Sequence, residues 1–346
     1  MNAGIAAHSA PGAVVLLVKN GQVIFHKAYG HHTYKNDARP VRTDDIFDLA
    51  SVTKVSATTQ VVMELYDKGS LRLNDPISKY VAATRSIKDK QDIKIKEALL
   101  HEAGYTPYIK FYEKLQPGDM SRDSSAAYPT AVADGYYLRK NYFEDVMWPV
   151  TLQSPVTTRG KYVYSDVSMY MMKEVVENIT HEPLQTHLSE GLYARLGLQT
   201  MGFLPRRRFP VDRIVPTTEN DNWFRNMLVQ GYVNDPGAAM AGGVEGHAGL
   251  FSNANDLAIL YQMLLNKGSY GGTQYYKPAT VALFTSAQSK VSGRGLGFAK
   301  VAANLPSSSG LASNVSYGHS GYTGTFVGRS ALRTDLHMPD QPGVPG

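Results

Sequence analysis

The stretch DLASVTKVSATTQVV, Asp48–Val62, holds a serine and a lysine three positions apart, Ser51 and Lys54. The β-like run DIFDLA precedes Ser51, and apolar residues at helical spacing follow until Gly69, which predicts Ser51 at a strand-to-helix boundary. Residues i and i+3 share one helix face, so the Lys54 amine can lie near the Ser51 hydroxyl and accept its proton. A capping serine followed by a surface lysine explains the same four residues equally well.

A second motif, Tyr164-Ser165-Asp166, is expected on a loop just before a helix. A tyrosine beside a cationic lysine can have its phenol pKa lowered and can then shuttle a proton. The competing interpretation is structural: Ser165 or Asp166 caps the helix while Tyr164 packs.

A third motif, His319-Ser320-Gly321, lies in the glycine-bracketed, β-like segment YGHSGYTGTF. Glycine in a strand often marks the close approach of a ligand or of another backbone. A strand edge at this place could donate the Tyr322 N–H to an oxyanion. A glycine-rich turn without chemistry is the alternative.

In this order, the three motifs resemble those of the penicillin-recognising serine hydrolases: class C β-lactamases, DD-peptidases and β-lactamase-like (family VIII-type) esterases. That family carries Ser-x-x-Lys, Tyr-x-Asn and Lys-Thr-Gly, or a histidine variant of the last, in the same sequence. The resemblance runs from PGAVVLLVKNG to GHSGYTGTF and includes IKEALLHEAGY and GGVEGHAGLFSNANDLA. In detail the chain is similar to β-lactamase-like modules fused to family 3 glycoside hydrolases, which implies a fused or associated glycoside hydrolase in the parent protein.

The resemblance implies hydrolysis through a covalent acyl-serine, with no metal or organic cofactor. Ser51 would be the nucleophile, Lys54 would activate it, and Tyr164 would relay a proton to the leaving group. The backbone N–H groups of Ser51 and Tyr322 would form the oxyanion hole, each donor contributing about 3 kcal/mol. The expected partner is a small-molecule ester, amide or β-lactam.

The resemblance also implies substrate contacts by Asp166, His319, Ser320 and Gly321, and two of these depart from the family. His319 stands where lysine is more common, and a neutral imidazole binds a substrate carboxylate less strongly than an ammonium does. This shifts the expectation from β-lactams and peptides toward small esters. Asp166 replaces an asparagine, and its carboxylate could either keep Lys54 protonated or orient it.

Two other classes of site were weighed. The segment HEAGY lacks the second histidine of a His-Glu-x-x-His zinc site, because Tyr105 takes that place, and His247 in EGHAG is expected to be structural. The serious alternative is a non-catalytic module that keeps the fold and binds cell-wall peptide or glycan. Asp166 favours that alternative, whereas Ser51 and Lys54 oppose it.

The expected fold is α/β (α+β), β-lactamase/transpeptidase-like: an antiparallel sheet formed by both termini, flanking helices and an inserted, mostly helical lobe. GAVVLLVKNGQVIFHKAYG predicts a hairpin around Asn20-Gly21. The expected boundaries are 1–50 with 255–327 for the sheet lobe and 51–254 for the helical lobe. Residues 110–160 are expected to be irregular and to line the site.

The segment 328–346 shows no strand pattern, has three prolines in its last eight residues, and is expected to be a disordered or frame-shifted tail.

Composition excludes several classes of protein. With 346 residues, 43% of them hydrophobic and 19% charged, the chain is typical of globular proteins. The absence of cysteine excludes disulfides, zinc–thiolate sites and cysteine nucleophiles. The net charge of +5 is scattered apart from Arg206-Arg207-Arg208, which is expected to be a solvated turn rather than a nucleic-acid patch. No apolar run reaches the ~18 residues of a membrane span, and no export signal is present, so a cytoplasmic location is expected, or a periplasmic one if the natural N-terminus lies further upstream.

Overall fold

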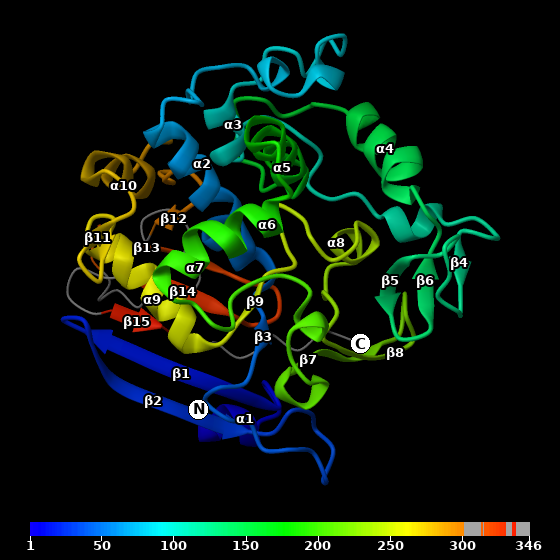
Figure 1. Ribbon diagram of the computed structural model, residues 1–346, viewed down its shortest axis with the longest axis vertical. Coiled ribbons are helices and arrows are strands. Elements are labelled where there is room, and N and C mark those ends of the chain that lie inside the picture. Colours follow the sequence, from blue (N-terminus) through cyan, green and yellow to red (C-terminus); the bar gives the residue numbers. More distant parts are fainter. Residues whose placement is uncertain (301–312, 314, 330–333, 337–346) are drawn as a thin grey trace.

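The structure, a computed structural model, describes residues 1–300, 313, 315–329 and 334–336 (Figure 1). Its strand ladders are antiparallel, and its helices lie between and over small sheets. The predicted α+β class is therefore confirmed. The division into two lobes at the predicted boundaries stays a prediction.

The N-terminal hairpin forms as predicted. Strand β1 (Gly12–Lys19) pairs antiparallel with β2 (Gln22–Gly30). Asn20 and Gly21 have φ angles of 52° and 76°, and a type I′ turn requires positive φ at both central residues.

The two ends of the chain share this sheet, because β15 (Thr334–Leu336) pairs with the other edge of β1 and places Leu336 opposite Leu16. The prediction that 328–346 contains no strand is therefore wrong at β15, and also at Gly328 and Arg329, which end strand β14 (Phe326–Arg329). A three-residue strand is too short to produce a visible pattern, and its partner lies more than 300 positions away. The remainder of the tail prediction concerns residues outside the described ones.

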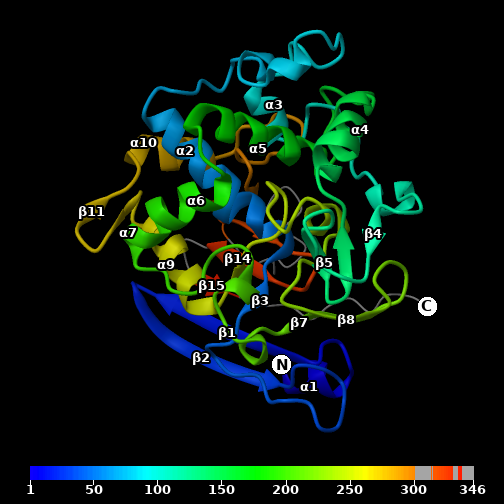
Figure 2. The same cartoon turned by 45° about the vertical axis from the view of Figure 1, so that its right-hand side comes forward.

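A second three-stranded sheet has the order β12-β13-β14. Its strands are β12 (Ala299–Lys300), β13 (Tyr317–Ser320) and β14 (Phe326–Arg329). Helix α9 (Ala254–Leu265) packs against β1 and β14 (Figures 1 and 2). Asn253 caps this helix, since its side chain accepts the Asp256 N–H at 2.9 Å.

The segment around Ser51 begins at β3 (Phe47–Asp48), which pairs with β9 (Phe251–Ser252). A 3₁₀ turn at Ala50–Val52 follows, then a π-helical turn at Lys54–Thr58 and helix α2 (Thr59–Asp67). The helix predicted after Ser51 is confirmed, but its first turns are 3₁₀ and π rather than α.

Most of the remaining helices surround α2 and share one buried core with it, with β1 and with α9. They are α3 (Ile95–Leu99), α5 (Val167–Thr180), α6 (Leu184–Leu188), α7 (Ala194–Leu196) and α10 (Pro278–Thr285). Among them, α5 is the helix expected directly after Tyr164-Ser165-Asp166. Helix α1 (Asn2–Ala6) contacts β2 instead, and α8 (Pro236–Met240) belongs to a second buried cluster.

The predicted irregular segment 110–160 is more ordered than expected. It forms a small sheet in the order β4-β6-β5 and then α4 (Trp148–Gln153). The strands are β4 (Met120–Ser121), β5 (Thr130–Ala133) and β6 (Tyr136–Leu138). Figures 1 and 2 both place this sheet on the side of α4, away from β1 and β2. Two short hairpins complete the fold, β7 (Pro216–Asp221) with β8 (Met227–Gln230) and β10 (Ser269–Tyr270) with β11 (Thr273–Gln274).

None of the helices in the described part of the chain combines the length and the apolar character that crossing a membrane requires.

Candidate active site

The backbone turn that carries Ser51 is strained. Ala50 has φ of +44°, a left-handed conformation that costs a non-glycine residue about 1–2 kcal/mol. The buried Asp48 carboxylate stabilises this turn, because its Oδ1 accepts the Ala50 N–H at 2.9 Å. Its Oδ2 accepts the Asn234 N–H at 2.7 Å, so the same carboxylate joins the turn to a distant segment.

Ser51, Lys54 and Asp166 form a continuous polar contact. Lys54 Nζ donates to Ser51 Oγ at 2.8 Å and lies 2.7 Å from Asp166 Oδ1. The lysine is fully buried, and its ammonium also donates to the His247 carbonyl at 3.2 Å. The alternative of a surface lysine is therefore wrong.

Tyr164 lies over this lysine, with its ring centre 4.9 Å from Lys54 Nζ. The imidazole of His101 packs on the Tyr164 ring at 4.5 Å between centres. His101 Nδ1 also accepts the Ser165 N–H at 3.2 Å, and so holds the loop that carries the tyrosine. His101 belongs to the segment HEAGY, where the sequence indicated no such contact.

The charges settle which groups hold protons at rest. Burial lowers the pKa of Lys54, but the contacts of Lys54 with Asp166 and Tyr164 together outweigh burial and leave that pKa raised. Burial raises the pKa of the Tyr164 phenol, and the neighbouring Lys54 ammonium only partly opposes this. The prediction of a lowered tyrosine pKa is wrong, because desolvation of the phenolate is the larger effect. The resting site thus holds an ammonium, a carboxylate and a neutral phenol.

The turn that carries Tyr322 is bonded directly to the Ser51 turn. Thr323 Oγ1 donates to the Asp48 carbonyl at 2.7 Å, and Thr325 Oγ1 donates to the Leu49 carbonyl at 3.0 Å. A Cβ on Gly321 would lie 2.6 Å from the Leu49 carbonyl oxygen, so only glycine permits this approach. The proposed oxyanion donors therefore lie on two joined segments, although their role stays a prediction.

A cavity of about 380 Å³ opens beside Ser51, Tyr164, Asp166 and Tyr322. Sequence reasoning missed most of its other walls, which come from separate loops. These walls are Ala50, Tyr108, Tyr112, Trp223, Asn234, Asp235, Pro236, His247 and Ala248. Within 110–160, Tyr112 is the residue that lines this cavity.

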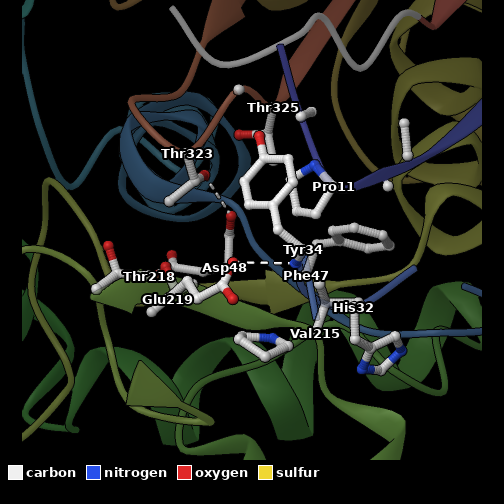
Figure 3. Close-up of a pocket in the computed structure, with 16 residues that line it drawn as sticks. Pro11, His32, Tyr34, Phe47, Asp48, Val215, Thr218, Glu219, Thr323 and Thr325 are labelled. Atoms are coloured by element: carbon white, nitrogen blue, oxygen red, sulfur yellow. Dashed lines mark hydrogen bonds between the residues drawn. The ribbon is translucent and has the colours of Figure 1, made fainter. Parts of the chain in front are cut away.

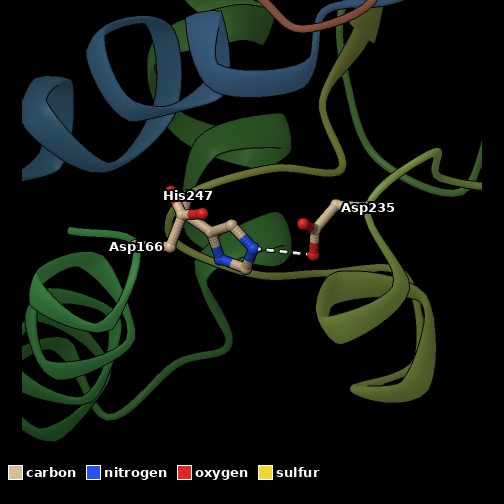
Figure 4. Close-up of side chains that lie close together, drawn as sticks. All are labelled: Asp166, Asp235 and His247. Atoms are coloured by element: carbon tan, nitrogen blue, oxygen red, sulfur yellow. Dashed lines mark hydrogen bonds and ion pairs between the residues drawn. The ribbon is translucent and has the colours of Figure 1, made fainter. Parts of the chain in front are cut away.

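Asp235 and His247 form an ion pair in the cavity wall, with His247 Nε2 donating to Asp235 Oδ1 at 2.8 Å (Figure 4). Burial lowers the pKa of His247, but Asp235 and Asp166 outweigh burial and raise it. The expectation that His247 is purely structural is thus incomplete. Donor atoms of these three residues lie within 4.8 Å of one another, which is close enough for a metal ion. Each carboxylate already has a cationic partner, however, because Asp235 is paired with His247 and Asp166 is paired with Lys54.

His319, Ser320 and Gly321 do not line this cavity, and their contact with substrate stays a prediction. His319 is buried, and its Nδ1 donates to the Ser320 carbonyl at 2.7 Å. Burial and then the positive charges of Arg294 and Lys54 hold the pKa of His319 well below its usual value. The imidazole is therefore neutral, as the sequence analysis assumed.

A smaller cavity of about 100 Å³ lies beside Asp48, Thr323 and Thr325 (Figure 3). Neither Ser51 nor Lys54 lines it. The candidate chemistry is therefore confined to the larger cavity.

Comparisons with known proteins agree on the fold. The sequence profile of the family described as Beta-lactamase matches residues 1–330. A protein of Escherichia coli O157:H7, whose name proposes a D-alanyl-D-alanine carboxypeptidase, is 32% identical over 343 residues, which cover 92% of this chain and 75% of the relative. An N-acetylmuramyl-L-alanine amidase of Bacillus subtilis (strain 168) is 32% identical over 364 residues, which cover 95% and 78%.

Two solved structures show the same arrangement of the chain. The hydrolase EstCE1, described as having promiscuous acyltransferase activity, matches with a TM-score of 0.70 and 20% identity over 97% of this chain and 91% of that one. The octameric penicillin-binding protein homologue from Pyrococcus abyssi matches with a TM-score of 0.69 and 18% identity over 96% and 70%. At these identities the likeness concerns the fold alone, and it confirms the predicted β-lactamase/transpeptidase-like architecture.

Proposed function

Because the chain belongs to the β-lactamase family of serine hydrolases, we propose that it cleaves small, uncharged carboxylic esters through an acyl intermediate on Ser51. The observation that carries this proposal is the 2.8 Å hydrogen bond between Lys54 Nζ and Ser51 Oγ, at the wall of a cavity that Tyr164 also lines. A capping serine and a solvated lysine would not be arranged in this way.

The acylation step uses the three side chains in turn. Ser51 Oγ attacks the ester carbonyl carbon and loses its proton to Lys54 in the neutral form. Tyr164 donates its phenol proton to the departing alcohol and is reprotonated by Lys54. Water then attacks the acyl-serine, its proton returns through the same groups, and the free acid leaves. Because Asp166 holds Lys54 protonated at rest, the reactive form is a minor one at neutral pH.

The charges of the cavity support esters over substrates that carry a carboxylate. His247, which lines the cavity, is paired with Asp235. The Lys54 ammonium, which lies behind Ser51, is paired with Asp166. A substrate carboxylate would enter beside these two aspartates and find its possible partners already neutralised. The carboxyl group of a D-alanyl-D-alanine peptide or of a β-lactam therefore disfavours binding here.

The test compares three substrates on purified protein: p-nitrophenyl butyrate, a chromogenic cephalosporin and a D-alanyl-D-alanine peptide. We expect the ester to be cleaved fastest, Ser51→Ala to abolish cleavage, and mass spectrometry to find the butyryl group on the Ser51 peptide. Ser70→Ala, which changes an exposed serine beyond α2, is the matched control and should keep full activity. If the protein melts cooperatively yet cleaves none of the three, the hydrolase proposal fails and the non-catalytic binding module takes its place.

A further inference from the structure

The lining of the candidate active-site cavity includes aromatic rings that the acyl-transfer chemistry does not use. Tyr108 and Tyr112 come from the segment after α3, Trp223 from the loop between β7 and β8, and Tyr322 from the turn between β13 and β14. Four rings from three separate segments thus converge on the cavity that Ser51 lines.

Two of these rings are held open to solvent. Trp223 is 54% exposed and Tyr322 is 74% exposed, although both line the cavity. The Tyr112 ring lies 4.9 Å from Trp223 and 5.6 Å from Phe224, centre to centre, and Trp223 stacks beside Phe224 at 6.2 Å. Exposed apolar rings that support one another at the rim of a cavity typify a binding surface more than a core.

The loop that carries Trp223 is anchored by a buried ion pair. Arg225 and Asp221 are each 1% exposed, and their Nε and Oδ2 atoms lie 2.5 Å apart. Arg225 also donates to the carbonyl groups of Val233, at 2.7 Å, and Asn234, at 2.9 Å. The loop is therefore bonded to the segment that leads to the cavity wall, and its backbone is held in place before a ligand binds. Such preorganisation lowers the entropic cost of binding.

From this geometry we infer that Tyr112, Trp223 and Tyr322 form a subsite for an uncharged aromatic ring of the substrate. The ring is uncharged because the ionised groups of the cavity are already paired with one another, Lys54 with Asp166 and His247 with Asp235. Offset or edge-to-face contact between aromatic rings adds to the area that any ring of similar size would bury. A faster hydrolysis of aromatic esters rests on the proposed function, whereas binding of an aromatic ring at this subsite does not.

The first experiment uses two pairs of esters that differ only in whether the ring is aromatic. Benzyl acetate is compared with cyclohexylmethyl acetate, and methyl phenylacetate with methyl cyclohexylacetate, by titrating the acid released at constant pH. In at least one pair we expect kcat/KM to favour the aromatic ester by about three- to tenfold, the range that one aromatic contact provides. The pair that responds shows whether the ring belongs to the alcohol or to the acid.

Variants assign that preference to the subsite. Trp223→Ala should reduce the ratio to about one, and Trp223→Phe should restore most of it. Trp148→Phe is the matched control, because Trp148 is the other of the two tryptophans. Trp148 lies in α4, outside the cavity lining, and its ring stacks on that of Phe143. A ratio of one for both pairs in the unmodified protein, or a ratio that Trp223→Ala leaves unchanged, overturns the inference.

The second experiment needs no turnover. The double variant Ser51→Ala/Trp148→Phe keeps Trp223 as its sole tryptophan, so its fluorescence reports on the subsite. Methyl phenylacetate should change the fluorescence saturably and methyl cyclohexylacetate should bind more weakly. If ring binding saturates while the unmodified protein hydrolyses no ester, the proposed function fails and the subsite stands. If esters are hydrolysed but no saturable signal appears, the subsite fails and the proposed function stands.

Discussion

Replacing Asp166 by asparagine separates the two roles that its carboxylate could have toward Lys54. The substitution removes the negative charge but keeps an oxygen, Oδ1, in the place where it meets Lys54 Nζ at 2.7 Å. An orienting contact would therefore survive, whereas the electrostatic hold on the proton of Lys54 would be lost. If the charge is what matters, Asp166→Asn should be more active than the unmodified protein at neutral pH.

The distance indicates how large this effect is. At an effective dielectric constant of about 20, unit charges 2.7 Å apart attract each other by about 6 kcal/mol. A fully buried ammonium without that partner would destabilise the fold by about 3–5 kcal/mol. Lys54 avoids this cost by losing its proton. A change of only about 1.4 kcal/mol in the free energy of this deprotonation already changes the neutral fraction of Lys54 tenfold. We therefore expect kcat/KM at pH 7 to rise at least about tenfold.

The assay is the pH dependence of kcat/KM for p-nitrophenyl butyrate, measured for the unmodified protein and for Asp166→Asn. The rising limb, which follows deprotonation of Lys54, should move to lower pH in the variant. Asp123→Asn removes an exposed carboxylate elsewhere and controls for the change in net charge. Thermal melts at each pH show whether the variant remains folded.

The same ion pair contributes to stability with a definite sign. Because the pKa of Lys54 in the folded protein is raised above 10.5, its contribution is fully present below that pH and is lost as the pH rises through the folded value. The reasoning about the proton is refuted if the pH profile of Asp166→Asn keeps both the position and the height of the profile of the unmodified protein. Asp166 would then orient Lys54 rather than hold its proton.

Three further changes test the supports of the site. Asp48→Asn places an amide N–H against backbone donors such as that of Asn234, and urea unfolding should show a loss of about 1–3 kcal/mol together with reduced kcat. Gly321→Ala brings a Cβ within 2.6 Å of a carbonyl oxygen of the nucleophile turn, and should lower kcat more than KM in ester assays. His187 bonds Glu64, which lowers the pKa of Glu64 from 4.5 to about 2 and raises the pKa of His187 above 6.5. The stability that this pair contributes is therefore fully present between pH 4.5 and 6.5. It is lost as the pH falls toward 2, and it is lost as the pH rises through the pKa of His187 in the folded protein. His187→Gln should lower the melting temperature most within that window, and an unchanged pH profile of the melting temperature would contradict this assignment.

Features that depend on nearby residues could be predicted from the sequence alone. The hairpin follows from Asn20-Gly21, because turn geometry is set within a few positions. This is a local rule, so one sequence suffices to apply it. The i,i+3 spacing made a contact between Ser51 and Lys54 possible, but the structure was needed to choose it over a capping serine and a surface lysine.

The charge state of the site and its surroundings follow from long-range packing. The sequence showed neither the 2.7 Å contact between Lys54 and Asp166 nor the full burial of the lysine. The pKa of Tyr164 rises rather than falls, because burial outweighs the neighbouring ammonium, and burial is not visible in a sequence.

The aromatic wall, the Asp235–His247 pair and strand β15 depend on contacts between distant segments, and no local pattern carries them. Trp223 and Tyr322 are about one hundred positions apart, yet they line one cavity because separate loops end at the same place. Local sequence preferences act over a few residues, whereas a cavity is formed by whichever segments the packed core brings together. The candidate chemical groups of this protein could therefore be found from the sequence, whereas the packing of the chain sets their protonation and the cavity that they face.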